Sequence, residues 1–495
     1  MNVADALGRW AEETPFAVAI AERDRLVAYR ELDAAVWRIA SRLSAAGLRP
    51  GDRVGLSLAG NSALYLATAY ALARLGAALL LLPVGEPPAL RRALARRFHL
   101  AAVIGADEGA ALDGIPLLKA VADWGNPDAV PAAAGPRAAG GAAAWRICLS
   151  SGTTGLPKAM VRTHADQIRL CEIGHRQVGH APGHRFLALT AFHFSYGLEE
   201  AMVTLGGGGT VIVVPLPISM PALCGVIDRE NVTRLAVTPT LASELLPYLT
   251  DETPRFPGIE RFSISTMFTP EPLRRELRRR VTANLVICYG TNELWYIASA
   301  DVATQLRFPE AAGHPVDGVE IEIVDDRDRP LPPGEVGLVR LRGSTLPAGY
   351  LDDPEATAKA FRSGWYYPGD LGVLAPEGVL FLKGRADDMI NYDGIKIYPA
   401  EIEVALQRHP DVAEAAAFPV TIDGYRQLPV AAVVPRGSTS AEALAAFCRG
   451  QIGERAPVKI WLFDTLPKTS TGKVLKRELA ERLSRAVAER RGGGA

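Results

Sequence analysis

Residues 149–158 read Leu-Ser-Ser-Gly-Thr-Thr-Gly-Leu-Pro-Lys and directly follow an apolar run over 145–149. Two glycines let the backbone turn tightly around a ligand, while hydroxyls, backbone amides and one lysine offer donors and positive charge. This combination suits a polyphosphate. The Walker phosphate loop needs four residues between its glycines and then Lys-Ser or Lys-Thr, which this segment lacks. The segment therefore predicts a strand that leads into a phosphate-binding loop of another kind.

The length and charge of the chain narrow the possible partners. A chain of 495 residues is too long for one hydrophobic core and predicts two or three domains. A formal net charge of -1 provides no electrostatic footprint for nucleic acid or for an anionic membrane. We therefore expect small-molecule substrates, and neither nucleic acid nor a membrane as a partner.

Cysteine and histidine spacing gives no sign of a disulfide framework or a metal centre. The five cysteines are far apart and odd in number, which indicates reduced thiols in a cytoplasmic protein. His175, His180 and His184 lack the helical spacing and the acidic or cysteine companions of a metal site. We expect no metal at these histidines.

The N-terminus and the longest apolar run argue against export and membrane insertion. Asp5 stands where a signal peptide would be basic and then apolar. The run over 63–84 carries Arg74 at its middle, and a central arginine costs at least ~2.5 kcal/mol in a bilayer. Because Gly76 interrupts the run, we expect a core helix followed by a buried strand over 78–82.

Apolar periodicity indicates an α/β protein. A helical pattern over 31–46 precedes an apolar strand over 54–58, and this alternation continues, as in a helix-covered and mostly parallel sheet. Residues 319–324 alternate apolar and acidic side chains, which predicts an antiparallel hairpin in a small β-barrel-like subdomain. We expect a large N-terminal domain over 1–384 and a smaller α+β C-terminal domain over 385–495.

The phosphate-loop segment resembles the Ser/Thr-Ser-Gly-Thr-Thr-Gly-x-Pro-Lys signature of the adenylate-forming superfamily, which contains acyl-CoA synthetases, peptide-synthetase adenylation domains and luciferases. The resemblance covers essentially the whole chain, because later motifs follow in the superfamily's order and are closest to those of aryl-CoA ligases. These are Tyr-Gly-Thr-Asn-Glu at 289–293, Gly-Trp-Tyr-Tyr-Pro-Gly-Asp at 364–370, Gly-Arg-Ala-Asp-Asp at 384–388 and Pro-Lys-Thr-Ser-Thr-Gly-Lys at 467–473.

The resemblance implies ATP, Mg²⁺ and coenzyme A as cofactors or co-substrates of an AMP-forming acid–thiol ligase. Glu293 matches the residue that holds Mg²⁺ beside the phosphates, and a single carboxylate is chemically sufficient for a phosphate-bound magnesium ion. Asp370 matches the ligand of the ribose hydroxyls. The residues implied in ATP or cofactor binding are Ser150, Ser151, Gly152, Thr153, Thr154, Gly155, Lys158, Tyr289, Gly290, Asn292, Asp370, Arg385 and Lys396.

The resemblance also implies two half-reactions. Lys158, Glu293 and Lys473 are the catalytic residues of the first, in which a carboxylate attacks the α-phosphate of ATP and negative charge must be neutralised. Asp387 matches the hinge about which a mobile C-terminal domain turns. This rotation withdraws Lys473 and brings another face of the domain over the site, so that a thiol attacks the acyl adenylate.

Two segments are candidates for the acid pocket. His193, Phe194, Tyr196 and Gly197 belong to a run similar to the one that lines the acyl pocket of benzoate-type ligases, although aromatic side chains are also common core filler. Met267 and Phe268 stand where the superfamily has small residues. Bulky groups on both sides predict a short, flat slot and hence a small aromatic or short-chain acid.

Departures from the superfamily pattern leave two alternatives open. Asn292 replaces the usual threonine before the glutamate, and its amide can still donate to a phosphate oxygen. One alternative is a free-standing adenylation enzyme that loads a carrier protein, although no aspartate stands near His193 to bind an amino-acid amine. The other is a catalytically silent ATP-binding relative, suggested by Asn292 and by Met267 and Phe268.

Overall fold

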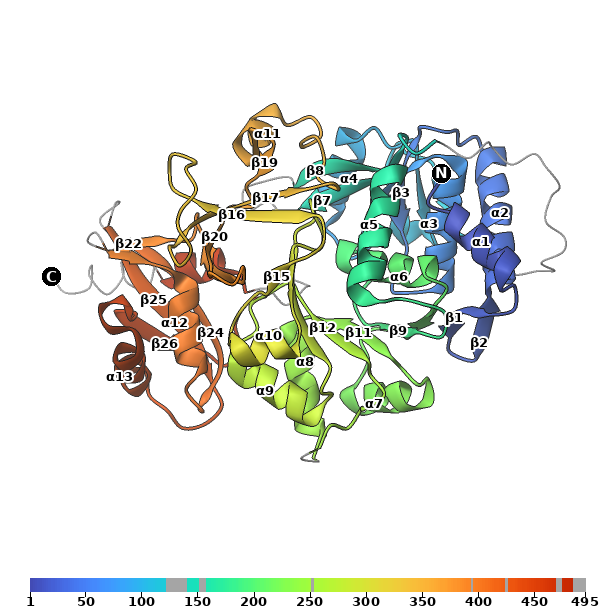
Figure 1. The fold of residues 1–495 in the computed structure, drawn as a ribbon. Helices are drawn as coiled ribbons and strands as arrows, with labels where there is room; N and C mark the ends of the chain where they lie inside the picture. The colour runs from blue at the N-terminus through green and yellow to red at the C-terminus, as the bar shows by residue number, and fades with distance from the viewer. Residues whose placement is uncertain are drawn as a thin grey trace.

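The computed structural model describes residues 1–121, 140–150, 157–250, 253–392, 395–422, 426–468 and 474–483. The described chain forms two large sheets, a small antiparallel subdomain and a C-terminal lobe (Figure 1). The predicted α/β class, with its mostly parallel sheets and its separate C-terminal part, is confirmed.

The first sheet has the strand order β6-β5-β3-β4-β7-β8, and every neighbouring pair is parallel except β7 with β8. Its outer face is covered by α4 (Pro88–Arg97). The strands are β3 (Arg53–Ser57), β4 (Ala78–Leu81), β5 (Ala102–Gly105), β6 (Leu117–Lys119), β7 (Ala144–Ser150) and β8 (Lys158–Thr163).

The second sheet has nine strands in the order β15-β14-β13-β12-β11-β9-β10-β1-β2, of which the six from β13 to β1 are parallel. Its strands are β1 (Val18–Glu22), β2 (Arg25–Ala28), β9 (Arg185–Ala188), β10 (Thr210–Val213), β11 (Arg234–Val237), β12 (Arg261–Ile264), β13 (Leu285–Tyr289), β14 (Ala298–Ala300) and β15 (His314–Pro315).

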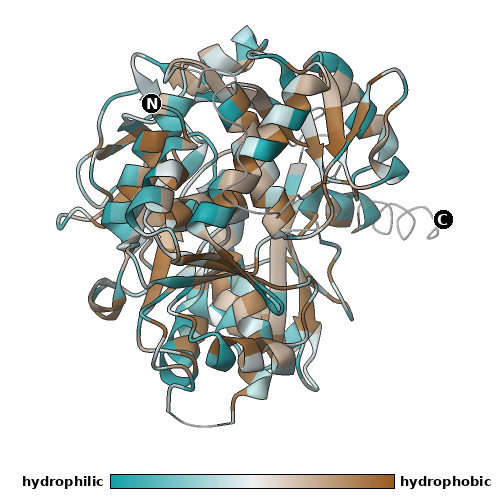
Figure 2. Ribbon diagram, turned by 90° about the vertical axis from the view of Figure 1, so that its right-hand side faces the viewer, coloured by the Kyte–Doolittle hydropathy of each residue, from teal (hydrophilic) through white to brown (hydrophobic). Residues whose placement is uncertain are grey.

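Helices between the two sheets form the largest hydrophobic core. α2 (Tyr29–Ala45), α3 (Ala63–Leu75) and α6 (Ser195–Gly206) pack against strands of both sheets. The other face of the nine-stranded sheet is covered by α7 (Met220–Arg229), α8 (Pro239–Leu245) and α9 (Glu271–Arg280). In Figure 2 the central strands are mostly brown and the helices around them carry teal on their outer sides, as this layered burial requires.

The antiparallel subdomain links the second sheet to the C-terminal lobe. β16 (Val319–Val324) pairs with β17 (Gly337–Gly343), and β17 also pairs with β20 (Asp370–Leu374), which forms a hairpin with β21 (Leu380–Arg385). Val319, Ile321 and Ile323 point into a core that they share with β17. The hairpin predicted from their alternation is therefore confirmed.

The C-terminal lobe is a three-stranded sheet with two helices on one face, while the helical residues Leu479 and Leu483 pack on the other (Figure 1). After the short hairpin of β22 (Ile390–Tyr392) and β23 (Ile395–Ile397), the lobe contains α12 (Pro399–Gln407), β24 (Val412–Ile422), β25 (Arg426–Pro435), α13 (Ala441–Ile452) and β26 (Lys459–Leu462). β21 ends at Arg385, so the predicted boundary between 384 and 385 falls at the end of a strand.

The local predictions for the N-terminal half are confirmed. The pattern over 31–46 is α2, and the run over 63–84 contains α3, which ends at Gly76 in the left-handed conformation, and the fully buried strand β4. Across the described ranges, no helix combines the length and apolarity that a membrane span requires.

Candidate active site

The phosphate-loop segment joins the antiparallel strands β7 and β8. Ser150 is paired with Lys158 at the ends of these strands, so the loop closes over a short distance. The side chain of Ser150 and the predicted ligands Ser151, Gly152, Thr153, Thr154 and Gly155 lie outside the described residues. Lys158, at the start of β8, borders a large cleft.

This cleft has a volume of about 1840 Å³ and lies between both sheets, the antiparallel subdomain and the C-terminal lobe. A pocket for one drug-sized ligand is about 300–1,000 Å³, so the cleft has room for more than one substrate. The predicted site residues that line it are Lys158, Tyr289, Gly290, Asn292, Glu293, Asp370, Arg385 and Asp387, together with His193, Phe194, Tyr196, Met267 and Phe268.

Glu293 is presented by the loop that follows β13, at the carboxyl end of a parallel strand. Its side chain is almost fully buried, and the Tyr350 hydroxyl donates to Glu293 Oε1 at 2.8 Å. Burial and the neighbouring carboxylate raise the pKa of Tyr350 and of Tyr366, so both hydroxyls stay protonated and can donate. The Lys158 ammonium lies 5.0 Å from the centre of the Tyr350 ring.

Glu293 fits a magnesium ion that is shared with a nucleotide. Within the described ranges, no cluster of three or more His, Cys, Asp or Glu side chains could hold a metal on protein ligands alone. Magnesium is usually bound through one or two carboxylates plus substrate phosphates, which matches a single buried carboxylate near a lysine.

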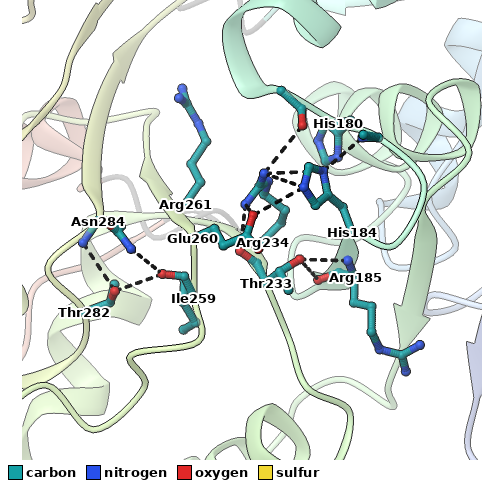
Figure 3. A network of polar contacts seen from close by, with 12 residues as sticks. His180, His184, Arg185, Thr233, Arg234, Ile259, Glu260, Arg261, Thr282 and Asn284 are labelled. Atoms are coloured by element: carbon teal, nitrogen blue, oxygen red, sulfur yellow. Dashed lines mark hydrogen bonds and ion pairs between the residues drawn. The ribbon is translucent and has the colours of Figure 1, made fainter.

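The three histidines near residue 180 make structural contacts. Arg234 lies between His184 and Glu260, with its Nη2 3.0 Å from His184 Nε2 and its Nη1 2.7 Å from Glu260 Oε2 (Figure 3). His175 and His180 contact Val203 and Glu200 on α6. Because burial lowers the pKa of all three imidazoles, they favour the neutral form.

Asp370 begins β20 directly opposite Arg385 on β21. The Tyr289 hydroxyl donates to Asp370 Oδ2, and Arg385 Nη1 lies 3.3 Å from Asp370 Oδ1. Arg385 also approaches Asp387 Oδ2 at 3.4 Å. The β20–β21 pair therefore places Asp370, the candidate ribose ligand, beside Arg385. Tyr289, at the end of β13, contacts this aspartate, and Arg385 also contacts the predicted hinge residue Asp387.

Asn292 has a role that the sequence did not indicate. Its side-chain amide donates to the backbone oxygen of Leu149 at 2.8 Å, and its own backbone oxygen accepts from Arg162 Nη2 at 2.8 Å. Asn292 thus ties the end of β7 to the loop after β13. Gly290 is required by the same loop, since a Cβ there would lie 1.7 Å from the backbone oxygen of Trp295.

The aromatic wall of the cleft is built at the start of α6. The His193 and Phe194 rings lie 4.3 Å apart, and burial lowers the pKa of His193, which keeps this ring neutral. Gly197 is buried and does not border the cleft. A Cβ at Gly197 would lie 2.5 Å from the Thr190 backbone oxygen, so this glycine lets the helix pack against the preceding turn.

The opposite wall follows β12. Met267 and Phe268 border the cleft, and the Phe268 side chain is 39% exposed to it and to solvent. The preceding residue, Thr266, has a φ of 79° and therefore turns the chain sharply. The structure thus brings the two segments predicted for the acid pocket to the same cleft, as expected, with Gly197 as the exception.

A buried charge network lies beneath β7 and was not anticipated. Arg146 on β7 is ion-paired with Glu199 on α6, and both side chains are at most 2% exposed. Gln167 also donates to Glu199, and Arg146 Nε lies 3.2 Å from Cys148 Sγ. This network fixes the strand that leads into the phosphate loop against α6, which carries the aromatic wall.

The C-terminal lobe reaches the cleft through Lys468, which is ion-paired with Glu414 at 2.7 Å. Lys473 lies outside the described residues. Lys396, on β23, is exposed and does not border the cleft. A further contact joins the two parts of the chain, because Arg408 Nη2 lies 2.9 Å from Glu310 Oε1.

A nucleotide-sized cleft with a buried carboxylate, a lysine, a paired Asp–Arg and an aromatic slot defines an enzyme of the adenylate-forming class. Residues 7–351 match the family described as AMP-binding enzyme, and residues 401–473 match the AMP-binding enzyme C-terminal domain. The chain belongs to the AMP-binding enzyme family. The predicted superfamily is therefore confirmed.

Similar proteins include a feruloyl-CoA synthase of Amycolatopsis sp., which is 30% identical over 96% of this chain and 99% of its own length. A 3-hydroxybenzoate–CoA ligase of Aromatoleum sp. (strain CIB) is 30% identical over 94% of this chain and 93% of its own length. Among solved structures, the o-succinylbenzoate CoA synthetase from Bacillus subtilis with its acyl-adenylate intermediate has a TM-score of 0.86. It is 25% identical, over 96% of this chain and 97% of that one. These enzymes agree with the predicted acid–thiol ligase that uses ATP, Mg²⁺ and coenzyme A.

Proposed function

We propose that this protein activates a small aromatic carboxylic acid with ATP and transfers the acyl group to coenzyme A. The single observation that carries the proposal is that one cleft is lined both by Lys158, Glu293 and Asp370 and by the aromatic walls at 193–194 and 267–268. The feruloyl and 3-hydroxybenzoate ligases described above are named for aromatic acids, which supports the same substrate class here.

In the proposed first half-reaction, a carboxylate oxygen of the acid forms a bond to the α-phosphorus of ATP, and pyrophosphate leaves. Lys158 neutralises the leaving phosphates, Glu293 holds the metal, and Asp370 accepts hydrogen bonds from the ribose hydroxyls. Bound Mg²⁺ supplies charge neutralisation to the phosphate oxygens. The resemblance of the motif at 467–473 assigns Lys473 to the position beside the attacking carboxylate.

In the proposed second half-reaction, the thiol sulfur attacks the acyl carbon and AMP leaves. We infer that residues 385–495 turn about Asp387 between the two steps, since Lys396 does not border the cleft in the arrangement described here. A turn of the C-terminal lobe would move the face that carries Lys468 away from the cleft and bring the face that carries Lys396 to it. Separate arrangements also keep water away from a hydrolysable adenylate.

We propose a slot for an acid that is short and flat. The neutral His193 and Phe194 form one wall, and Met267 and Phe268 narrow the other. Pockets reject an oversized group sterically more sharply than they reward an extra methylene, which contributes only about 1–3 kcal/mol. Long alkyl chains should therefore be poor substrates.

An acid panel tests this proposal. Benzoate, 3-hydroxybenzoate, ferulate, acetate and dodecanoate are each mixed with ATP, Mg²⁺ and coenzyme A, and both pyrophosphate and thioester are measured. We expect the highest kcat/KM with an aromatic acid, a wider range in Met267→Gly, and an unchanged range in the volume-conserving Met267→Leu. If dodecanoate were the best acid, the slot would be wrong while adenylation would stand.

The same assay separates the alternative acceptors. Pyrophosphate release without a coenzyme A thioester would favour a carrier protein as the acyl acceptor. ATP binding without pyrophosphate release from any acid would favour the other alternative, a catalytically silent ATP-binding protein. The similar proteins named above are active ligases by name and do not support that alternative. A cytoplasmic location is also proposed, since all five cysteines are free thiols, as is typical of a reducing compartment.

A further inference from the structure

Tyr350 contacts both charged groups that we assign to the triphosphate. It follows β17 in the sequence, whereas Lys158 begins β8 and Glu293 follows β13, so the three residues come from distant segments. The hydroxyl of Tyr350 donates to Glu293 Oε1 at 2.8 Å, and its ring centre lies 5.0 Å from Lys158 Nζ. No role for Tyr350 follows from the sequence motifs.

The backbone around Tyr350 is held on both sides. Its amide donates to Thr357 Oγ1 at 2.9 Å, and the next amide, that of Leu351, donates to the Ala159 backbone oxygen at 2.6 Å. The second bond attaches the segment directly to the residue after Lys158. Gly349 is needed for this approach, because a Cβ there would lie 2.5 Å from Thr357 Cγ2.

The ring of Tyr350 is also fixed. It packs edge-on against Phe361, with ring centres 5.5 Å apart and an interplanar angle of 70°. A ring that is held by its backbone and by Phe361 has little rotational freedom. Its hydroxyl therefore directs one carboxylate oxygen of Glu293, and its face supports the Lys158 ammonium at a set distance from that carboxylate.

We propose that Tyr350 is a positioning residue that sets the separation of Lys158 and Glu293 and thereby raises the affinity of the site for a magnesium–triphosphate group. The inference rests on the proposed function. It assigns to Tyr350 no contact with the reacting atoms. The effect of Tyr350 should appear only with a nucleotide that carries a triphosphate. The hydroxyl should act on the Mg²⁺-bound form and the ring, through Lys158, on both forms, whereas AMP should be bound equally well with or without Tyr350.

The test is calorimetric binding of a non-hydrolysable ATP analogue and of AMP to the full chain over a range of free Mg²⁺ concentrations. Tyr350→Phe removes only the hydroxyl. A hydrogen bond to a charged group is worth about 1.5–3 kcal/mol, so the Mg²⁺ concentration for half-maximal analogue binding should rise roughly ten- to a hundredfold. Tyr350→Leu also removes the ring and should further weaken analogue binding without Mg²⁺. AMP binding should not change in either variant.

Tyr367→Phe is the matched control. Its hydroxyl contacts Arg340 at 3.4 Å in the same subdomain, and it does not border the cleft, so its Mg²⁺ dependence should equal that of the wild type. Unchanged Mg²⁺ dependence in both Tyr350 variants would overturn the inference. Equal weakening of analogue and AMP would also overturn it, because it would indicate a general structural role. Failure of the wild type to bind the analogue would instead count against the proposed function itself.

Discussion

The two sides of the cleft are held by different kinds of contact. On the side of the two sheets, Arg146 and Glu199 form an ion pair that is at most 2% exposed, beneath the strand that enters the phosphate loop. On the C-terminal side, the contacts are exposed ion pairs such as Arg385–Asp387 and Arg408–Glu310. Buried pairs are costly to break and exposed pairs are not. From this difference we propose a rigid wall that binds ATP and acid, and a wall that can move.

The largest effect should come from the movable side. Lys473→Ala should lower adenylate formation by about 10²- to 10³-fold, because removal of one well-placed charge stabiliser costs on the order of 3–4 kcal/mol of transition-state stabilisation. Thioester formation from a supplied acyl adenylate should be largely spared, since the lysine acts only in the first half-reaction. Stopped assays of each half-reaction measure this, and equal loss in both would contradict the assignment.

The next largest effect should come from the rigid wall. Glu199→Gln leaves the Arg146 charge buried without its counter-ion, which should lower the free energy of unfolding by about 3–5 kcal/mol. Denaturant titration measures this loss. Glu172→Gln, on the exposed face of α5 (His164–Val178), is the control and should stay within about 0.5 kcal/mol of the wild type. Similar losses in the two variants would contradict the assignment of this stability to the buried Arg146–Glu199 pair.

Low pH should also lower the free energy of unfolding, through a histidine on the side of the two sheets. Burial lowers the pKa of His164 to about 4, and its Nδ1 accepts a hydrogen bond from the Val3 amide. Below pH 6.5 the unfolded chain takes up the proton and the folded chain does not, so stability falls until about pH 4. Between pH 7.5 and pH 5 the wild type should lose roughly 2 kcal/mol more than His164→Asn in denaturant titrations. Parallel losses in both proteins would contradict this.

The smallest effect should come from the exposed pair that joins the two parts of the chain. Arg408→Ala should change the rate of adenylate formation by no more than about fivefold, because exposed ion pairs contribute only about 0.2–1 kcal/mol. Arg455→Ala is the matched control, since Arg455 pairs with Glu401 inside the C-terminal lobe at similar exposure. If the control slowed adenylation as much as Arg408→Ala, the contact with Glu310 would have no special role.

Local patterns in the sequence predicted the framework well, because helices and strands bury side chains at fixed periods. α2, β4 and β16 follow from the spacing of their own apolar residues. The resemblance supplied the candidate site, and most of its described residues border one cleft. Lys396 does not border it, and we propose that it acts in another arrangement of the C-terminal lobe.

The contacts that hold the site could not be predicted in the same way. Tyr350 and Glu293 are 57 positions apart, Arg146 and Glu199 are 53 apart, and Asn292 reaches Leu149 across 143 positions. No local period relates such pairs, and each depends on how whole strands and loops come together. Asn292 illustrates the consequence. The sequence suggested a phosphate ligand, which stays a prediction, and the structure adds that the Asn292 amide fastens the strand before the phosphate loop.

The most direct test of a rigid wall and a turning lobe is to stiffen the predicted hinge. In the described part of the chain the Asp387 amide donates to no backbone oxygen, so Asp387→Pro fixes φ near -65° without removing a backbone hydrogen bond. The two half-reactions are then measured separately, with Asp387→Ala as the control. We expect Asp387→Pro to form the adenylate at close to the wild-type rate and to lose thioester formation from a supplied adenylate, while Asp387→Ala keeps both. Retention of both half-reactions in the proline variant would contradict the account.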